Sequence, residues 1–232
     1  MTDLILIPGL WLDASSWEPI LPALEAAGHR PHPVTLPGVG APAEQSAHIR
    51  LADWIDAVVA RIDDLDGPVV LVGHSGGGNV AYGAADRCVG KVARVVLVDT
   101  MPPASGASIS EFPAVDGVVP FPGWDFFDEE DVYDIDAPTR ERTAPRMKTV
   151  PAHVPTDELL LVDDARFTVP VTVLSGGHDE AALRELISQW PAWRDAFDAI
   201  ESVEVVRLGT GHWPQFTRPE VLAQAIVAAV PS

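Results

Sequence analysis

Short continuous apolar runs alternate with helix-like segments along the chain. The runs are typical of strands buried on both faces of a sheet and occupy residues 4–7, 69–72, 93–98, 169–174 and 203–208, with a shorter candidate at 33–36. Helices are predicted between them, at 16–27, 47–65, from near Asn79 onward, 180–189 and 219–230. Such alternation predicts an α/β fold with a mostly parallel central sheet and helices on both faces.

Residues 101–164 interrupt this pattern. They are rich in proline, carry an acidic cluster at 125–136 and show no sustained helical or alternating periodicity. We predict a short irregular lid here, inserted into an α/β core formed by residues 1–100 and 165–232. A disordered surface loop is the alternative, but the segment contains aromatic side chains that favour packing against the core: Phe112, Phe121, Trp124, Phe126, Phe127 and Tyr133.

Composition limits the possible partners and compartment. The 232 residues are 47% hydrophobic and carry a formal net charge of −19, so nucleic acid and anionic membranes would be repelled. No apolar run approaches the roughly 18 residues that span a bilayer, and Cys88 is the single cysteine. We therefore expect a cytoplasmic protein without nucleic-acid or membrane partners, in which Cys88 is a small buried group. Its oligomeric state is not indicated.

The strongest chemical signal is the pentapeptide Gly73-His74-Ser75-Gly76-Gly77, which follows the apolar run at 69–72 directly. A G-x-S-x-G between a buried strand and a helix is typical of a nucleophile elbow, in which small neighbours allow one serine to project its hydroxyl. A simple glycine-rich turn is the alternative interpretation. The context favours Ser75 as a nucleophile and His74 as a packed turn residue.

A serine nucleophile needs a base and a group that orients this base. His212, in a glycine-rich loop after the last predicted strand, is the candidate base. Asp179, which follows the strand at 169–174, is the favoured orienting acid. Asp99 is a rival, because it also ends a buried strand.

The same edge of the predicted sheet would supply the oxyanion donors. They are expected to be the backbone amides of Gly76, next to the nucleophile, and of Leu10, in the loop after the first strand. The remaining histidines lack the spacing of metal ligands, and the glycine clusters match no nucleotide-binding motif. We expect neither a metal nor a cofactor.

Three stretches of the chain together resemble the α/β-hydrolase superfamily. They are residues 4–9 running on to 17–19, the elbow at 71–78, and Gly211-His212-Trp213-Pro214 followed by 218–220. The order Ser75, Asp179, His212 is that of this superfamily. The chain is similar to its compact serine esterases, which are related to small methyl esterases, hydroxynitrile lyases and cofactor-free haloperoxidases. One departure is Pro8, which stands where a histidine often precedes the glycine.

The resemblance implies hydrolysis of a carboxylic ester or lactone through an acyl-Ser75 intermediate, with His212 and Asp179 in the family roles. A serine nucleophile counts against dehalogenase and epoxide hydrolase relatives, which use aspartate. Two alternatives stay open: a ligand-binding protein on a hydrolase body, and non-hydrolytic chemistry such as lyase, perhydrolase or carbon–carbon cleavage. A small, largely apolar substrate is expected, because the candidate pocket residues are Trp11, Leu12, Met101, Trp124, Phe126, Phe127 and Trp213.

Overall fold

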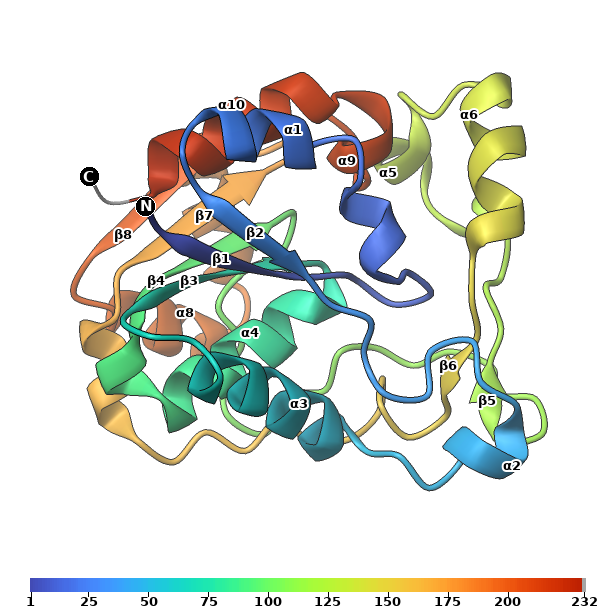
Figure 1. Ribbon diagram of the computed structural model, residues 1–232, viewed down its shortest axis with the longest axis horizontal. Helices are drawn as coiled ribbons and strands as arrows, with labels where there is room; N and C mark the ends of the chain where they lie inside the picture. Colours follow the sequence, from blue (N-terminus) through green and yellow to red (C-terminus); the bar gives the residue numbers. More distant parts are fainter. Residues whose placement is uncertain (231–232) are drawn as a thin grey trace.

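One parallel sheet organises the molecule. The computed structural model describes residues 1–230, and six strands form the sheet in the order β2-β1-β3-β4-β7-β8 (Figure 1). The strands are β1 (Asp3–Ile7), β2 (Arg30–Pro33), β3 (Val69–His74), β4 (Val92–Val98), β7 (Val171–Ser175) and β8 (Val203–Arg207). Because all six run in the same direction, their carboxyl ends meet along one edge, where ligands of open α/β sheets bind.

Alternate residues of each strand bury against opposite layers of helices. Leu4 and Leu6 face a layer formed by the 3₁₀ helix η1 (Ala14–Trp17), α1 (Leu21–Ala26) and α10 (Pro219–Ala229), above the sheet in Figure 1. Ile5 and Ile7 face the other layer, formed by α3 (Leu51–Asp63), α4 (Gly76–Arg87), α7 (Glu180–Ile187) and α8 (Pro191–Asp198). A strand buried on both sides explains why the apolar runs are continuous.

The boundaries of several elements differ from the predicted ones. β2 ends at Pro33, where the strand was expected to begin, because residues Arg30–Pro33 pair with β1 and the apolar Val34 follows the strand. This edge position tolerates two prolines, which cannot donate to a ladder. The first helix begins only at Leu21, after η1 and Pro19, and α8 was not predicted. α4 begins at Gly76, directly after the elbow serine.

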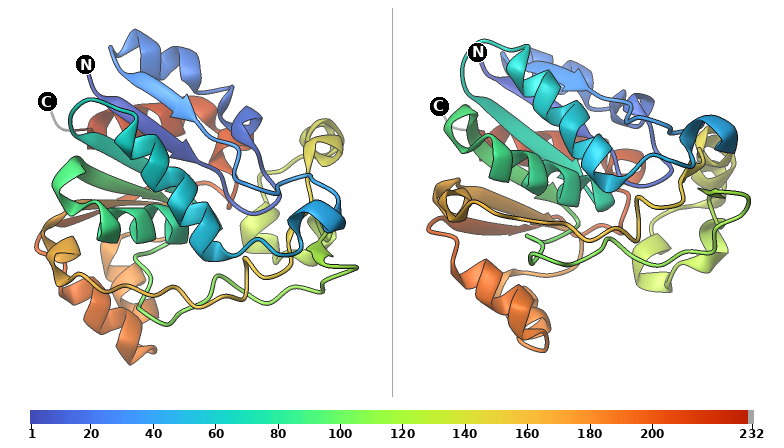
Figure 2. Two further views of the ribbon diagram at one scale, coloured as in Figure 1. Left: turned by 60° about the horizontal axis from the view of Figure 1, so that its bottom comes forward. Right: turned by 90° about the horizontal axis from the view of Figure 1, so that it is seen from below.

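Residues 101–164 contain more regular structure than expected. They form a two-stranded antiparallel sheet of β5 (Val118–Val119) and β6 (Val150–Pro151), with the short helices η3 (Trp124–Phe126), α5 (Glu129–Val132), α6 (Ala137–Thr143) and η4 (Ala144–Arg146). In the two views of Figure 2, β5, β6, α6 and the adjoining α2 (Ala43–Ser46) lie to one side of the main sheet. The Asp86 carboxylate in α4 accepts from the amides of Val162 and Asp163 and fixes the return to the core. The division into core and lid stays a prediction, and positions 231–232 lie outside the described residues.

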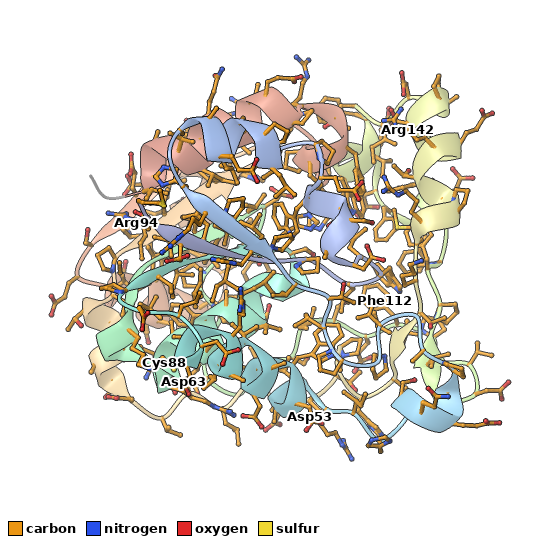
Figure 3. The ribbon with its side chains drawn as sticks, in the orientation of Figure 1. Asp53, Asp63, Cys88, Arg94, Phe112 and Arg142 are labelled. Carbon is orange, nitrogen blue, oxygen red and sulfur yellow. The ribbon has the colours of Figure 1, made fainter. Side chains whose placement is uncertain are left out.

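Cys88 lies far from the edge that carries the candidate site. Figure 3 shows it close to Asp63, at the opposite end of the molecule from Phe112. The thiol is half-buried against the core, and burial raises its pKa, so the packed role predicted for it is consistent with its surroundings. Within residues 1–230, no helix is both long and apolar enough to cross a membrane.

Candidate active site

Ser75 occupies a tight turn between β3 and α4. Its backbone has φ 51° and ψ −128°, a conformation that side chains rarely adopt and that presents the hydroxyl at the sheet edge. The turn needs small neighbours: a Cβ on Gly77 would lie 2.6 Å from the carbonyl oxygen of Ile7, and one on Gly9 would lie 3.0 Å from the Ser75 Cβ. The local sequence therefore holds a strained serine between two closely packed loops.

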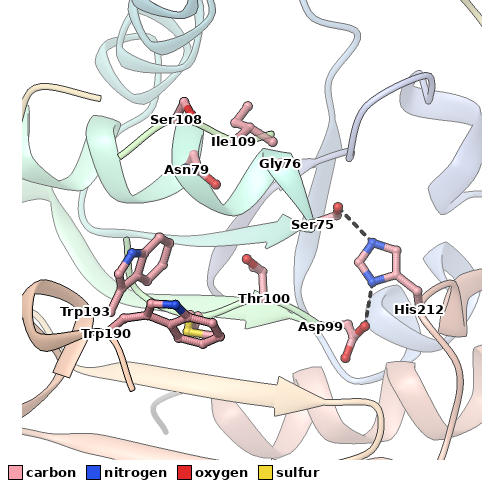
Figure 4. A pocket seen from close by; sticks show the side chains of 11 residues that line it. Ser75, Gly76, Asn79, Asp99, Thr100, Ser108, Ile109, Trp190, Trp193 and His212 are labelled. Carbon is pink, nitrogen blue, oxygen red and sulfur yellow. Dashed lines mark hydrogen bonds and ion pairs between the residues drawn. The ribbon is translucent and has the colours of Figure 1, made fainter. Parts of the chain in front are cut away.

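A hydrogen-bonded relay joins Ser75 to a carboxylate. The Ser75 Oγ lies 2.8 Å from His212 Nε2, and His212 Nδ1 lies 2.6 Å from Asp99 Oδ2 (Figure 4). Ser75 follows β3, Asp99 follows β4, and His212 lies in the loop between β8 and α9 (Pro214–Thr217). Three segments distant in sequence thus meet at one edge of the sheet, as a nucleophile, a base and an orienting group require.

The expectation for Asp179 is wrong, because its side chain does not contact His212. Asp179 is the N-cap of α7, where its carboxylate accepts a 2.9 Å hydrogen bond from the Ala182 amide. The loop after β7 continues past Gly176 before Asp179, whereas Asp99 follows the last residue of β4 immediately. In the structure, the carboxylate that contacts His212 is therefore that of Asp99, the alternative candidate.

The surroundings of Asp99 favour its charged form. Burial alone would raise the pKa of this carboxyl, but the hydrogen bond and charge of His212 outweigh burial, and the net pKa is lowered. The Gly176 amide donates to the other oxygen, Asp99 Oδ1, over 2.7 Å and acts in the same direction. Asp99 is therefore a fixed anion against which an imidazolium can form.

Asp131 brings a second carboxylate close to this pair. The side-chain atoms of Asp99, Asp131 and His212 that could bind a metal all lie within 4.8 Å of one another. Among residues 1–230, this is the one cluster of three possible metal ligands. Burial raises the pKa of Asp131, and the backbone carbonyl of this residue accepts from the His212 amide over 2.8 Å. Both ring nitrogens of His212 are already bonded, to Asp99 and Ser75, so the arrangement suits proton transfer better than metal binding.

His74 is a packed residue of the elbow, as its position suggested. It is buried, its Nε2 donates to the His212 carbonyl oxygen over 2.7 Å, and its Nδ1 lies 3.3 Å from the Gln215 amide nitrogen. Both contacts suit the neutral ring. Burial and the nearby charge of His212 lower the pKa of His74 to about 3.

This shift predicts a stability that falls in acid. Below pH 6.5 the unfolded chain protonates His74 while the folded chain keeps it neutral down to about pH 3, so the folded state loses stability across that window. The loss is at most about 1.4 kcal/mol per pH unit. His74→Gln is expected to flatten this slope in urea unfolding measured between pH 7 and pH 4. A slope equal to that of the wild type would contradict the buried neutral state.

The backbone amides of Gly76 and Leu10 stay the candidate oxyanion donors. Gly76 is the first residue of α4, so its amide precedes the hydrogen bonds of that helix. The Leu10 amide donates to no other described residue, and the Leu10 side chain packs next to Gly76, whose Cβ would lie 3.2 Å from Leu10 Cγ. The helix N-terminus adds a partial positive charge at the same point.

Two cavities meet at the serine. The larger, of about 340 Å³, lies beside α4 and the tryptophans near the start of α8. The smaller, of about 150 Å³, extends under the aromatic residues of segment 101–164. Ser75, Ile109 and His212 line both cavities. A substrate whose reacting carbon sits at Ser75 can therefore extend in two directions.

The model of the alpha/beta hydrolase family matches residues 4–225, which is nearly the whole chain. The chain belongs to this family.

Two relatives match about half of this chain. It is 37% identical over 112 residues to a carbendazim hydrolyzing esterase of Nocardioides sp. (strain SG-4G), covering 47% of this chain and 46% of that protein. It is 37% identical over 100 residues to a pimeloyl-[acyl-carrier protein] methyl ester esterase of Aromatoleum aromaticum (strain DSM 19018 / LMG 30748 / EbN1), covering 43% and 38%. Each match thus spans less than half of the relative's length.

A solved structure extends the likeness of the fold to the full chain. It is an extracellular alpha/beta-hydrolase from a Paenibacillus species, described as sharing structural and functional homology with tobacco salicylic acid binding protein 2. The two folds superpose with a TM-score of 0.81 at 20% identity, and the match covers 100% of both chains.

The predicted pocket residues divide into two groups. Met101 lines the larger cavity, and Trp11, Phe127 and Trp213 line the smaller one. The prediction is wrong for the other three. Leu12 and Trp124 are buried in a separate cluster with Trp213, and Phe126 is half exposed and lines neither cavity.

Several residues that line the two cavities were not predicted. In the larger cavity they include Asn79, Thr100, Trp190 and Trp193, and the smaller cavity adds Phe112. Asn79 could have been found, since it lies three residues after Gly76 and therefore on the same face of α4. Trp190 and Trp193 lie on either side of Pro191, the first residue of the unpredicted helix α8. No predicted element therefore placed them near the site.

Proposed function

We propose that this hydrolase is a serine carboxylesterase that cleaves small carboxylic esters through an acyl-Ser75 intermediate. The observation that carries the proposal is the unbroken relay from Ser75 Oγ through His212 to Asp99, with distances of 2.8 and 2.6 Å. Both are hydrogen-bond distances, so the nucleophile and its base are aligned for proton transfer.

Acylation follows from this geometry. Ser75 Oγ attacks the ester carbonyl carbon and transfers its proton to His212 Nε2, while Asp99 stabilises the imidazolium. The carbonyl oxygen becomes an oxyanion, which in this proposal the amides of Gly76 and Leu10 bind. The bond from carbon to the alcohol oxygen then breaks, and His212 returns the proton to the leaving alcohol.

Deacylation repeats the steps with water. His212 removes a proton from a water molecule, whose oxygen attacks the acyl carbon of the ester with Ser75. The second oxyanion is held by the same amides, and its collapse breaks the bond to Ser75 Oγ. His212 protonates the serine, and a carboxylic acid leaves.

The names of the relatives and the cavities support an ester of modest size. Both matched relatives are named as esterases. The larger cavity, at about 340 Å³, lies near the lower end of the range of small-molecule sites. A short, largely apolar ester or lactone is the substrate that fits both features.

The alternative functions receive less support from the site. A pure binding protein has no chemical need for a strained serine with a complete relay. A lyase of the hydroxynitrile type would require a lysine near the nucleophile. No lysine among the described residues lines either cavity. Lys148 Nζ instead lies 3.9 Å from Asp13 Oδ2.

The test combines covalent labelling with turnover. We expect a fluorophosphonate to label one serine per chain, and at least one of p-nitrophenyl acetate, butyrate and octanoate to be hydrolysed. Both are measured on folded protein, by intact mass and by release of p-nitrophenol. Labelling with negligible turnover of every ester would point to non-hydrolytic chemistry, and the absence of both would overturn the proposal.

A further inference from the structure

The larger cavity is lined by two tryptophans that belong to none of the hydrophobic core clusters of residues 1–230. Trp190 precedes α8 and is 47% exposed, and Trp193 lies in the first turn of that helix. Both line the cavity that ends at Ser75. An indole left this exposed at the rim of a cavity offers apolar area that a ligand can cover.

The faces of these two indoles are not used by other rings. Trp11, Trp124 and Trp213 each pack edge-on against neighbouring aromatic side chains. Trp190 and Trp193, by contrast, form no aromatic pair within residues 1–230. No other ring therefore competes for their π surfaces, and because both side chains line the cavity, a flat group there can stack on them or meet them edge-on.

A polar group faces the same space from the opposite element. Asn79 lies on α4, is only 6% exposed and lines the cavity across from the tryptophans (Figure 4). Its amide nitrogen is buried and bonds to no described residue. A buried amide without a partner destabilises the free protein, so a substrate atom that bonds to it gains both affinity and orientation. Because the side-chain amide can rotate, it can offer either a donor or an acceptor.

We propose that the larger cavity selects esters that carry one flat aromatic group with a polar substituent. The ring lies against Trp190 and Trp193, the substituent reaches Asn79, and the smaller group of the ester enters the cavity of about 150 Å³. The inference rests on the proposed esterase function and adds the substrate class to it.

The experiment compares ring chemistry at constant size. Substrates are methyl phenylacetate against methyl cyclohexylacetate, and benzyl acetate against cyclohexylmethyl acetate, so the ring stands on the acyl or the alcohol side. We expect kcat/KM to favour the aromatic member about tenfold in at least one pair, the scale of two aromatic contacts. The double variant Trp190→Leu/Trp193→Leu should abolish this ratio, and the double phenylalanine variant should retain most of it.

A matched control separates the cavity from general effects of removing an aromatic side chain. Tyr133 is 59% exposed and lines neither cavity, so Tyr133→Leu should leave the ratio unchanged. The polar contact is tested with the three methyl hydroxyphenylacetates, each compared with methyl phenylacetate by its ratio of kcat/KM. For at least one of them, Asn79→Leu should lower this ratio about fivefold. Urea unfolding checks that each variant is folded.

The outcomes distinguish the two proposals. If p-nitrophenyl acetate is hydrolysed but neither pair shows an aromatic preference, or the leucine variants keep it, the substrate class is wrong and the esterase stands. If Asn79→Leu left the kcat/KM ratio of every hydroxyphenylacetate to methyl phenylacetate unchanged, the proposed contact between the substituent and Asn79 would be wrong. If the folded protein hydrolyses no ester, the esterase proposal fails and this inference fails with it.

Discussion

Replacing Ser75 with alanine is expected to reduce the turnover of p-nitrophenyl acetate about 10⁶-fold. The expected loss is that measured when the serine of a comparable triad is removed. Without Oγ there is no acyl-enzyme, and His212 has no hydroxyl to deprotonate. Residual catalysis would come only from binding and from the amides of Gly76 and Leu10.

The variant should stay folded, which makes its loss of activity informative. The Ser75 side chain donates no hydrogen bond that holds the turn, and the close packing of Gly9 and Gly77 around it involves atoms that alanine keeps. Ser188→Ala, which removes an exposed hydroxyl on the C-cap of α7, serves as the matched control and should retain full turnover. Fluorophosphonate labelling that persisted in Ser75→Ala would show that another residue is the nucleophile.

The sequence pattern was sufficient for the parts of the site that depend on local structure. Continuous apolar runs identified the buried strands because both faces of the sheet are covered. The elbow could be predicted because that turn forms only where a strand, two glycines and a serine are adjacent in the sequence. His212 stood out for a similar reason, since it lies in a short glycine-rich loop after the last strand.

What the pattern could not supply was the order of strands and the paths of the loops. Asp99 and Asp179 both follow buried strands, so the sequence alone did not separate them. In the sheet, β4 lies directly beside β3, whereas β7 is one strand farther from the nucleophile. The lining tryptophans were missed for the same reason, because their place depends on how α8 packs in the folded chain.

Replacing Asp99 with asparagine is expected to lower kcat about 10⁴-fold, as in the precedent for serine proteases. The reason is the tautomer of His212. The Gly176 amide needs an acceptor, so the asparagine oxygen would take that 2.7 Å contact and turn its NH₂ group toward His212 Nδ1. Nδ1 would then have to accept, the proton would move to Nε2, and Nε2 could no longer receive the proton of Ser75.

Asp179→Asn provides the matched comparison, because it makes the same chemical change at the other strand end. Asparagine caps a helix about as well as aspartate, so α7 should keep its N-cap and the variant should keep near-wild-type kcat. Both variants are measured with p-nitrophenyl acetate across pH 6 to 9, with folding checked by urea unfolding. If Asp179→Asn lost more activity than Asp99→Asn, the loop after β7 would have to rearrange during catalysis to bring Asp179 to His212. Equal and mild losses would instead mean that neither carboxylate orients the base, and that Asp131, within 4.8 Å of the pair, substitutes for Asp99.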